Sequence, residues 1–201
     1  EILRDISFNM NEKTRCALAG ANGCGKSTLL KALTGELQSD SRRVTITKGA
    51  RISYLPQSDI VLGDKSVYDT AEEGYARFQL ILDEIKDCEE RTGRGGKEAM
   101  NAAERLSELH ETLVDSGYWD RKSRIETILM GLGFSISDFS RPAKEFSGGY
   151  QMRIALARIL VENPDFLLLD EPTNYLDIEA MTWLEEYLKG FNGGLMVVSH
   201  D

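Results

Sequence analysis

Gly-Ala-Asn-Gly-Cys-Gly-Lys-Ser occupies residues 20–27 of the chain. The stretch follows residues 14–19, which have the pattern of a β-strand. A helix is expected next, from about Lys26 to Thr34, with Gly35 as its stop signal. A glycine-rich turn between a strand and a helix is typical of an α/β fold, so we take this unit as the starting point for the rest of the chain.

The loop matches the pattern G-x-x-x-x-G-K-[ST], whose glycines let consecutive backbone N–H groups cradle a phosphate beside a helix N-terminus. Lys26 supplies the cation that bridges the β- and γ-phosphates of ATP, and Ser27 offers a hydroxyl to Mg²⁺. Cys24 is interpreted as a small residue at a permissive position rather than a redox sensor. The expected phosphate-binding residues are Gly20, Asn22, Gly23, Cys24, Gly25, Lys26, Ser27 and Thr28.

A second candidate site segment is Phe-Leu-Leu-Leu-Asp-Glu at residues 166–171. The apolar residues predict a buried strand, so Asp170 emerges at its carboxyl end, where ligands bind in parallel α/β sheets. Asp170 is therefore expected to hold Mg²⁺. Glu171 can act as the general base that polarises the attacking water.

The remaining pattern predicts an α/β fold with a mainly parallel core sheet. Residues 195–198 predict another buried strand, and a helix from Ile178 to Leu188 lies between it and the strand at 166–169. Residues 2–8, 44–46 and 51–55 predict further short strands, the first contributing to an N-terminal antiparallel β element. We expect a core at 1–57 and 140–201, and a helical insertion at 58–139.

The insertion is expected to contain a long hairpin of two antiparallel helices at about 66–114, because apolar residues recur there in steps of three and four. Arg91, Arg94 and Lys97 lie in the glycine-rich turn between the helices. These cations could contact a phosphate backbone, although a solvated turn has the same composition.

Composition limits the class of protein. Hydrophobic residues make up 41% of the 201 residues, enough for a core, and the net charge of −9 argues against a general nucleic-acid-coating surface. No apolar run approaches the ~20 residues that cross a bilayer. Three cysteines without metal-ligand spacing suit a reducing cytosol, so we expect a cytoplasmic protein without direct membrane insertion. Both ends are abrupt, which predicts a fragment of a longer protein.

The motifs become specific in their order along the chain. The phosphate loop, Gln57, Ser147-Gly148-Gly149, Asp170-Glu171 and finally His200 together resemble the ATP-binding cassette (ABC) family. The resemblance implies that Gln57 reaches Mg²⁺ and the attacking water, and that His200 contacts the γ-phosphate. It also implies that Ser147, Gly148 and Gly149 bind ATP held by an opposing cassette. Glycines that precede a helix suit that role, because they leave amides and a positive dipole end facing outward.

Two segments resemble the ABC-F branch in particular. They are Asp-Glu-Pro-Thr-Asn-Tyr-Leu-Asp at residues 170–177, with Asn174 after the threonine, and Ser-Gly-Gly-Tyr-Gln-Met-Arg at 147–153. Phe146, Tyr150 and Tyr175 depart from common family residues, Tyr175 replacing a histidine. The resemblance implies that the cassette pairs with a second one, either in the same longer chain or in a homodimer of the fragment. It also implies action on the ribosome near tRNA sites through the helical arm.

Two other functions share the same nucleotide residues. An ATP-binding subunit of a membrane transporter would dock to membrane helices rather than RNA, and the long arm and Asn174 favour the ABC-F interpretation over it. A nucleotide-gated assembly module with negligible turnover is disfavoured by the presence of Glu171.

Overall fold

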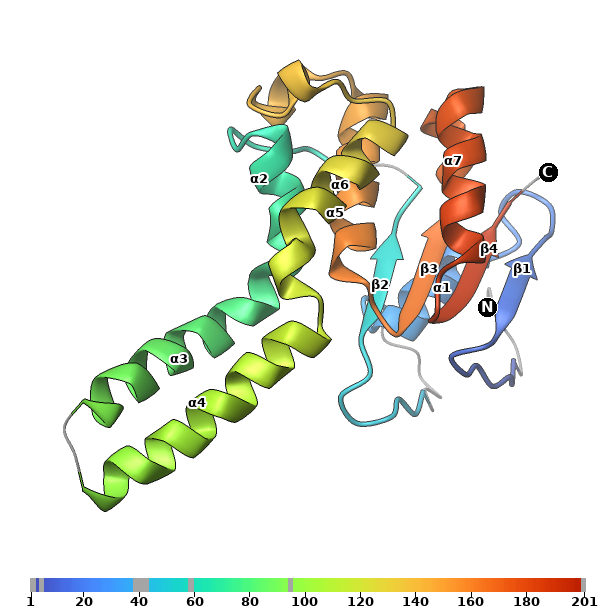
Figure 1. Ribbon diagram of the computed structural model, residues 1–201. Coiled ribbons are helices and arrows are strands. Elements are labelled where there is room, and N and C mark those ends of the chain that lie inside the picture. Colours follow the sequence, from blue (N-terminus) through green and yellow to red (C-terminus); the bar gives the residue numbers. More distant parts are fainter. Residues whose placement is uncertain (1–2, 4–5, 38–43, 58–59, 94–95, 200–201) are drawn as a thin grey trace.

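The computed structural model describes residues 3, 6–37, 44–57, 60–93 and 96–199 (Figure 1). Within them, four strands form one sheet in the order β1-β4-β3-β2, and every neighbouring pair is parallel. The strands are β1 Arg15–Leu18, β2 Ile52–Leu55, β3 Phe166–Asp170 and β4 Gly194–Val198. The prediction of an α/β fold with a mainly parallel sheet is confirmed.

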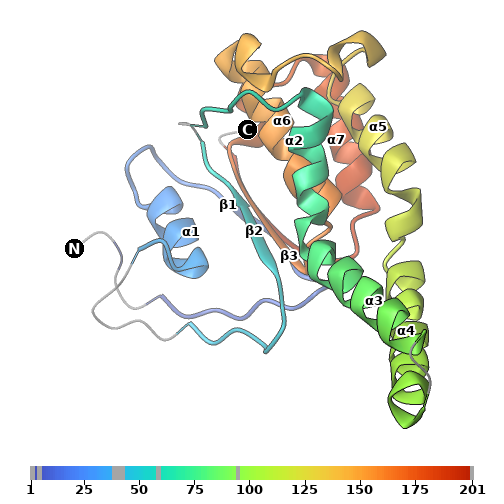
Figure 2. The same ribbon diagram turned by 90° about the vertical axis from the view of Figure 1, so that its left-hand side faces the viewer.

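Helices cover both faces of the sheet. Helix α1, Lys26–Thr34, lies on one face, while α6, Gly148–Glu162, and α7, Ile178–Lys189, lie on the other (Figure 2). Alternation along β3 serves both layers: Leu168 packs in a cluster with Leu30 of α1, whereas Leu167 and Leu169 belong to the larger core that includes α6. A strand covered on both faces needs the continuous apolar run seen in the sequence.

An arginine and an aspartate align β2 with β3 at the edge where these strands begin. The Arg51 backbone N–H and its Nε donate to Asp165 Oδ2 at 2.8 and 3.2 Å. The same guanidinium reaches the carbonyls of Glu162 and Asn163 at 3.2 and 2.9 Å, so it also holds the end of α6. These bonds set the register that pairs Ile52 with Phe166 and Leu55 with Leu169.

The N-terminal antiparallel element is not formed by the described parts of the predicted segments. Residues 6–8 and 44–46 are not strands, and Ile6, Phe8 and Ile46 are 49, 43 and 44% exposed. A short strand pair that buries neither face gains too little from its ladder to persist alone, which accounts for the difference. Residues 2, 4 and 5 lie outside the described residues.

Two antiparallel helices, α3 Gln79–Thr92 and α4 Lys97–Asp115, project from the body as an arm (Figure 1). They have 14 and 19 residues, about 21 and 28 Å at ~1.5 Å per residue. The arm is shorter than the hairpin expected at 66–114, because residues 67–78 form α2, Val67–Glu72, and a 3₁₀-helix, Glu73–Phe78, that pack on α6.

The chain returns from the arm through short helical segments that close the helical layer. They are the 3₁₀-helix Tyr118–Asp120, helix α5 Arg121–Gly131, and the 3₁₀-helices Ile136–Asp138 and Ala143–Glu145. Helix α5 packs against α6, and its residues Ile125 and Leu129 are fully buried. A further 3₁₀-helix, Pro172–Tyr175, follows β3 and leads toward α7.

The contact between the 3₁₀-helix 73–78 and α6 gives a stability prediction. A Cβ added at Gly74 would lie 2.5 Å from the Arg158 carbonyl oxygen, so Gly74→Ala must push two helices apart. We expect the free energy of unfolding to fall by about 1–3 kcal/mol, and the thermal midpoint by roughly 3–10 °C. Gly63→Ala is the matched control because a Cβ there meets none of the described residues within 4 Å. Equal melting temperatures for the two variants in a thermal unfolding scan would contradict the prediction.

Candidate nucleotide-binding site

The carboxyl ends of the parallel strands gather the predicted site residues at one edge of the sheet. The phosphate loop follows β1, Gln57 follows β2, and Asp170 and Glu171 stand at and just after the end of β3. This edge is where α/β sheets bind ligands. His200, which follows β4, lies outside the described residues.

The phosphate loop is closed around its own lysine. Gly23 and Gly25 have φ values of 78° and 101°, a left-handed conformation that glycine adopts without strain. No side chain of the described residues caps the start of α1, so none of them competes for the N–H groups of its first turn. Lys26 Nζ donates to the carbonyls of Gly20 and Ala21 at 2.7 and 3.2 Å, and the residue is only 9% exposed. The loop thus holds a buried cation next to the amides of a helix N-terminus, as anion binding requires.

Asp170 has the features of a cation ligand. The residue is 1% exposed, and its Oδ1 has no hydrogen-bond partner among the described residues. Its Oδ2 accepts from the Tyr54 hydroxyl at 3.4 Å. Burial, and then the charge of Asp170, raise the pKa of Tyr54, so that the tyrosine stays protonated and can donate. A buried carboxylate oxygen without a partner fits a bound metal ion.

Asp170 would be one of few carboxylate ligands for Mg²⁺, since the described residues contain no group of three His, Cys, Asp or Glu placed to hold a metal. The remaining ligands would be the oxygens of Ser27, Gln57 and the nucleotide, which suits an ion that binds few carboxylates plus phosphates. When bound, the ion neutralises charge on the transferring phosphate.

Glu171 is held from three directions. Its backbone is left-handed, with φ 51°, and its N–H donates to the Val198 carbonyl at 3.0 Å, which ties the residue to β4. The side chain belongs to a residue that is 8% exposed. Its Oε2 accepts from Gln57 Nε2 and from Asn174 Nδ2, both at 2.6 Å. A non-glycine residue with positive φ is strained, and such strain clusters at functional sites.

Ser147, Gly148 and Gly149 form a separate, outward-facing part of the candidate site. Ser147 and Gly148 are exposed at the start of α6, and within the described part of the chain no side chain caps that helix end. A Cβ at Gly148 would meet nothing within 4 Å, whereas one at Gly149 would lie 3.6 Å from the Tyr175 ring. The N-terminal amides of α6 therefore face a surface that another molecule can reach.

Arg153 connects this surface to the segment after β3. The residue is 7% exposed, and its guanidinium donates to the carbonyls of Tyr175 and Leu132 at 2.7 and 3.1 Å and to Asp177 Oδ2 at 2.9 Å. It also lies over the Tyr150 ring, 4.6 Å from the centroid. The Ala180 N–H, and then Arg153, lower the pKa of Asp177, so this N-cap of α7 stays ionised.

Sequence reasoning missed three contacts of the site. Tyr54 donates to Asp170, Asn174 donates to Glu171, and the Tyr175 hydroxyl donates to the Gln57 carbonyl at 2.6 Å. The spacing of three between Glu171 and Asn174, in a stretch that begins with Pro172, could have indicated a turn that brings the two side chains together. Tyr54 gave no comparable signal, because its role depends on the register between β2 and β3.

These features define the class: a nucleoside-triphosphate-binding domain with a phosphate loop, a buried aspartate and an adjoining glutamate at one sheet edge. Residues 3–174 match the sequence model of the ABC transporter family, and the chain belongs to that family. ABC cassettes bind and hydrolyse ATP, so the chain is an ATPase domain.

Relatives agree with this assignment, and a solved structure shares the fold. The chain is similar to the probable ATP-binding protein YheS of Haemophilus influenzae, 36% identical over the whole chain and 30% of the relative. It is also similar to the uncharacterized ABC transporter ATP-binding protein YfmM of Bacillus subtilis, 31% identical over the whole chain and 39% of the relative. The chain thus spans well under half of each. A dimeric ATP-binding cassette bound to ADP and Pi has the same fold, with a TM-score of 0.63 and 19% identity over 100% of this chain and 80% of that one.

Among the described residues, every helix is too short or too polar to span a bilayer.

The phosphate loop gives a binding prediction. Lys26→Ala removes the buried cation, so we expect the affinity for Mg·ATP to fall at least about tenfold, since a charge-assisted bond contributes roughly 1.5–3 kcal/mol. Titration calorimetry measures the effect. Lys31→Ala, in the last turn of the same helix, makes the same change of charge away from the loop and should bind as the parent does. Parental affinity in Lys26→Ala would show that the loop does not use this cation.

Proposed function

We propose that the chain is one cassette of a cytoplasmic ABC-F protein, which closes with ATP on a second cassette, reopens after hydrolysis, and acts on the ribosome in translation. The observation that carries the proposal is the arm α3–α4, a projection that nucleotide chemistry does not need. Asn174, which marks the ABC-F pattern, supports it from within the nucleotide site. The relatives' greater length leaves room for a second cassette.

Hydrolysis in this proposal depends on positioning and charge. Lys26 and the loop amides hold the β- and γ-phosphates, while Ser27, Asp170 and Gln57 hold Mg²⁺. Glu171 takes a proton from water as the water oxygen attacks the γ-phosphorus in line, and the bond to ADP breaks. His200 contacts the γ-phosphate, as the family resemblance implies.

A second cassette would supply contacts to the bound ATP that one cassette cannot make by itself. The uncapped N-terminus of α6 and the exposed Ser147 and Gly148 form an anion-binding surface separate from the chain's own phosphate loop. Two cassettes that face each other would each complete the other's site. A chain with one cassette alone should therefore hydrolyse ATP poorly.

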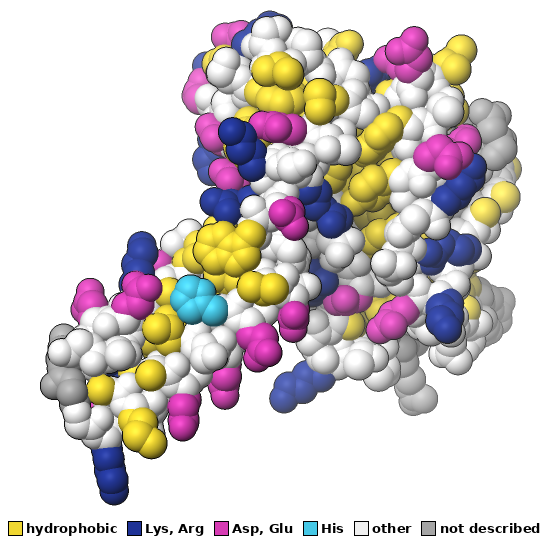
Figure 3. Space-filling model, viewed as in Figure 1, with side chains coloured by type: hydrophobic (Ala, Val, Ile, Leu, Met, Phe, Trp, Pro, Cys, Tyr) yellow, Lys and Arg dark blue, Asp and Glu magenta, His cyan; other side chains and the backbone are white. Residues whose placement is uncertain are grey.

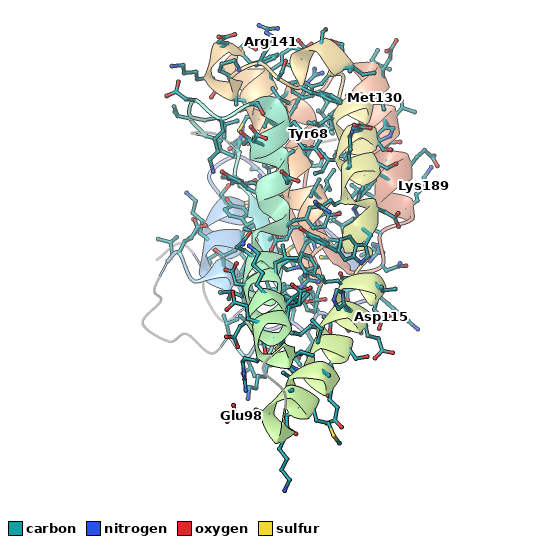
Figure 4. All side chains as sticks on the ribbon, turned by 60° about the vertical axis from the view of Figure 1, so that its left-hand side comes forward. Tyr68, Glu98, Asp115, Met130, Arg141 and Lys189 are labelled. Atoms are coloured by element: carbon teal, nitrogen blue, oxygen red, sulfur yellow. The ribbon has the colours of Figure 1, made fainter. Side chains whose placement is uncertain are left out.

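The charges on the arm limit how it could touch RNA. Each of α3 and α4 carries five acidic and two basic residues, and acidic side chains line one edge of the arm (Figure 3). These flanks would repel a phosphate backbone. The far end of the arm carries two exposed cations, Arg91 in the last turn of α3 and Lys97 at the start of α4. In Figure 4 the label Glu98 marks this end, and Asp115 lies toward the base. Arg94 lies outside the described residues. RNA contact is accordingly assigned to the tip.

The role of Glu171 can be tested by removing its charge. Glu171→Gln should keep ATP affinity, lower kcat by about 10²-fold or more, and trap the closed cassette pair with ATP. Measurements of nucleotide binding and phosphate release on the protein that contains the chain decide the matter. Glu179→Gln, at an exposed position in the first turn of α7, is the control. Hydrolysis at the parental rate in Glu171→Gln would refute the assignment of the general base.

The ribosome proposal is tested by charge reversal at the arm tip. With Arg91, Arg94 and Lys97 changed to Glu, we expect ribosome co-sedimentation to weaken at least about tenfold and its salt dependence to become shallower. The matched control reverses Lys13, Lys48 and Lys122, three exposed lysines of the body, and so changes the net charge equally. Equal ribosome binding by the two variants would show that the tip is only a solvated turn. Absence of ribosome binding in the parent, together with association with membrane proteins, would favour a transporter subunit.

A further inference from the structure

One oxygen of the Glu171 side chain receives two amide donors. Gln57 Nε2 and Asn174 Nδ2 each lie 2.6 Å from Oε2. Because a carboxylate can only accept, each amide must present its nitrogen rather than its oxygen. Two donors on one oxygen orient the carboxyl group more strictly than one, since they fix both its position and its rotation.

The two donors differ in how they are attached. Gln57 comes from the end of β2, 114 residues away in the sequence, and the family resemblance assigns its side chain to Mg²⁺ and water once nucleotide is bound. Asn174 is three residues from Glu171 in the 3₁₀-helix Pro172–Tyr175, where its backbone N–H donates to the Glu171 carbonyl at 3.3 Å. Main chain and side chain of Asn174 thus both bond to Glu171.

We propose that Asn174 is a positioning residue, which holds the Glu171 carboxylate in place when Gln57 turns to the metal and the water. The proposal rests on the general-base role assigned to Glu171 under the proposed function. Asn174 contacts neither nucleotide nor water in this scheme; it acts through Glu171. A short side chain bonded within one turn loses little entropy in holding this geometry, so the orientation survives the departure of Gln57.

If Asn174 had only a structural role, its truncation would give a different result from the one expected here. Asn174 is exposed, so truncating its side chain leaves no buried cavity. The main consequence of truncation is the loss of its hydrogen bond to Glu171. Loss of a group that only orients the base should lower kcat and leave the KM for ATP unchanged, because the phosphates are bound by other residues.

The experiment compares three substitutions at this position in the protein that contains the chain. Asn174→Ala should lower kcat about tenfold or more, with KM within about twofold of the parent. Asn174→Asp keeps the shape but sets a carboxylate against Oε2, so its kcat should fall further. Asn174→Gln keeps an amide donor and should recover part of the rate. Asn192→Ala, an exposed asparagine in the loop before β4, should behave as the parent does.

A double-mutant cycle with Glu171→Gln distinguishes positioning from folding. If Asn174 acts through Glu171, Asn174→Ala lowers no further the residual rate of the Glu171→Gln variant. Equal losses in both backgrounds, or a parental kcat in Asn174→Ala, would overturn the proposal. A Glu171→Gln variant that still hydrolyses ATP at the parental rate would instead overturn the role of Glu171 itself, so the two failures can be told apart.

A readout without turnover is the side-chain amide signal of Asn174 in the ¹⁵N NMR spectrum of the ligand-free protein that contains the chain. Bonded to a carboxylate, this amide should exchange slowly with water, and Glu171→Ala should make its exchange at least about tenfold faster while Glu179→Ala leaves it unchanged. Fast exchange in the parent chain would contradict the proposal.

Discussion

Parallel alignment of the strands is the constraint on which the rest of this structure depends. Four strands that run in one direction bring their carboxyl ends to one edge, although the segments that follow them are far apart in the sequence. Parallel sheets of this kind have both faces covered. Helix α1 covers one face, and α6 and α7 cover the other. The phosphate loop, Gln57 and the two acids at 170 and 171 then meet without any contact of their own having to bring them together.

A second level of organisation links this edge to the outward-facing glycines. Gln57 and Glu171 are joined by a side-chain bond, Tyr175 reaches the Gln57 carbonyl, and Arg153 of α6 reaches the Tyr175 carbonyl. Residues 171–175 stand at the centre of these bonds. A movement of Gln57 toward a ligand would therefore act on the same short segment that holds the start of α6, and packed segments of this kind respond as units.

The sequence predicted some levels of this structure better than others. The strand–loop–helix unit at 15–34, ended by Gly35, and the buried strand at 166–170 follow from local patterns, because apolar runs and glycines act within a few residues. The arm was predicted too long, since Val67, Ala71 and Tyr75 have a spacing that suits a hairpin and a core equally well. The contact of Gly74 with α6, like that of Tyr54 with Asp170, depends on tertiary packing that no local pattern contains.

The buried arginine has a consequence for how the chain can vary. Two of the three acceptors of Arg153 are main-chain carbonyls, of Leu132 and Tyr175, which every amino acid carries. Another side chain could therefore replace Tyr175 and leave this link to Arg153 intact. Arg153 itself cannot be replaced in this way, because a shorter cation would leave buried carbonyls unsatisfied. Tolerance to substitution is thus unequal around this arginine: Arg153 and the Asp177 carboxylate are restricted, whereas positions 132 and 175 bond through the main chain and can carry other side chains.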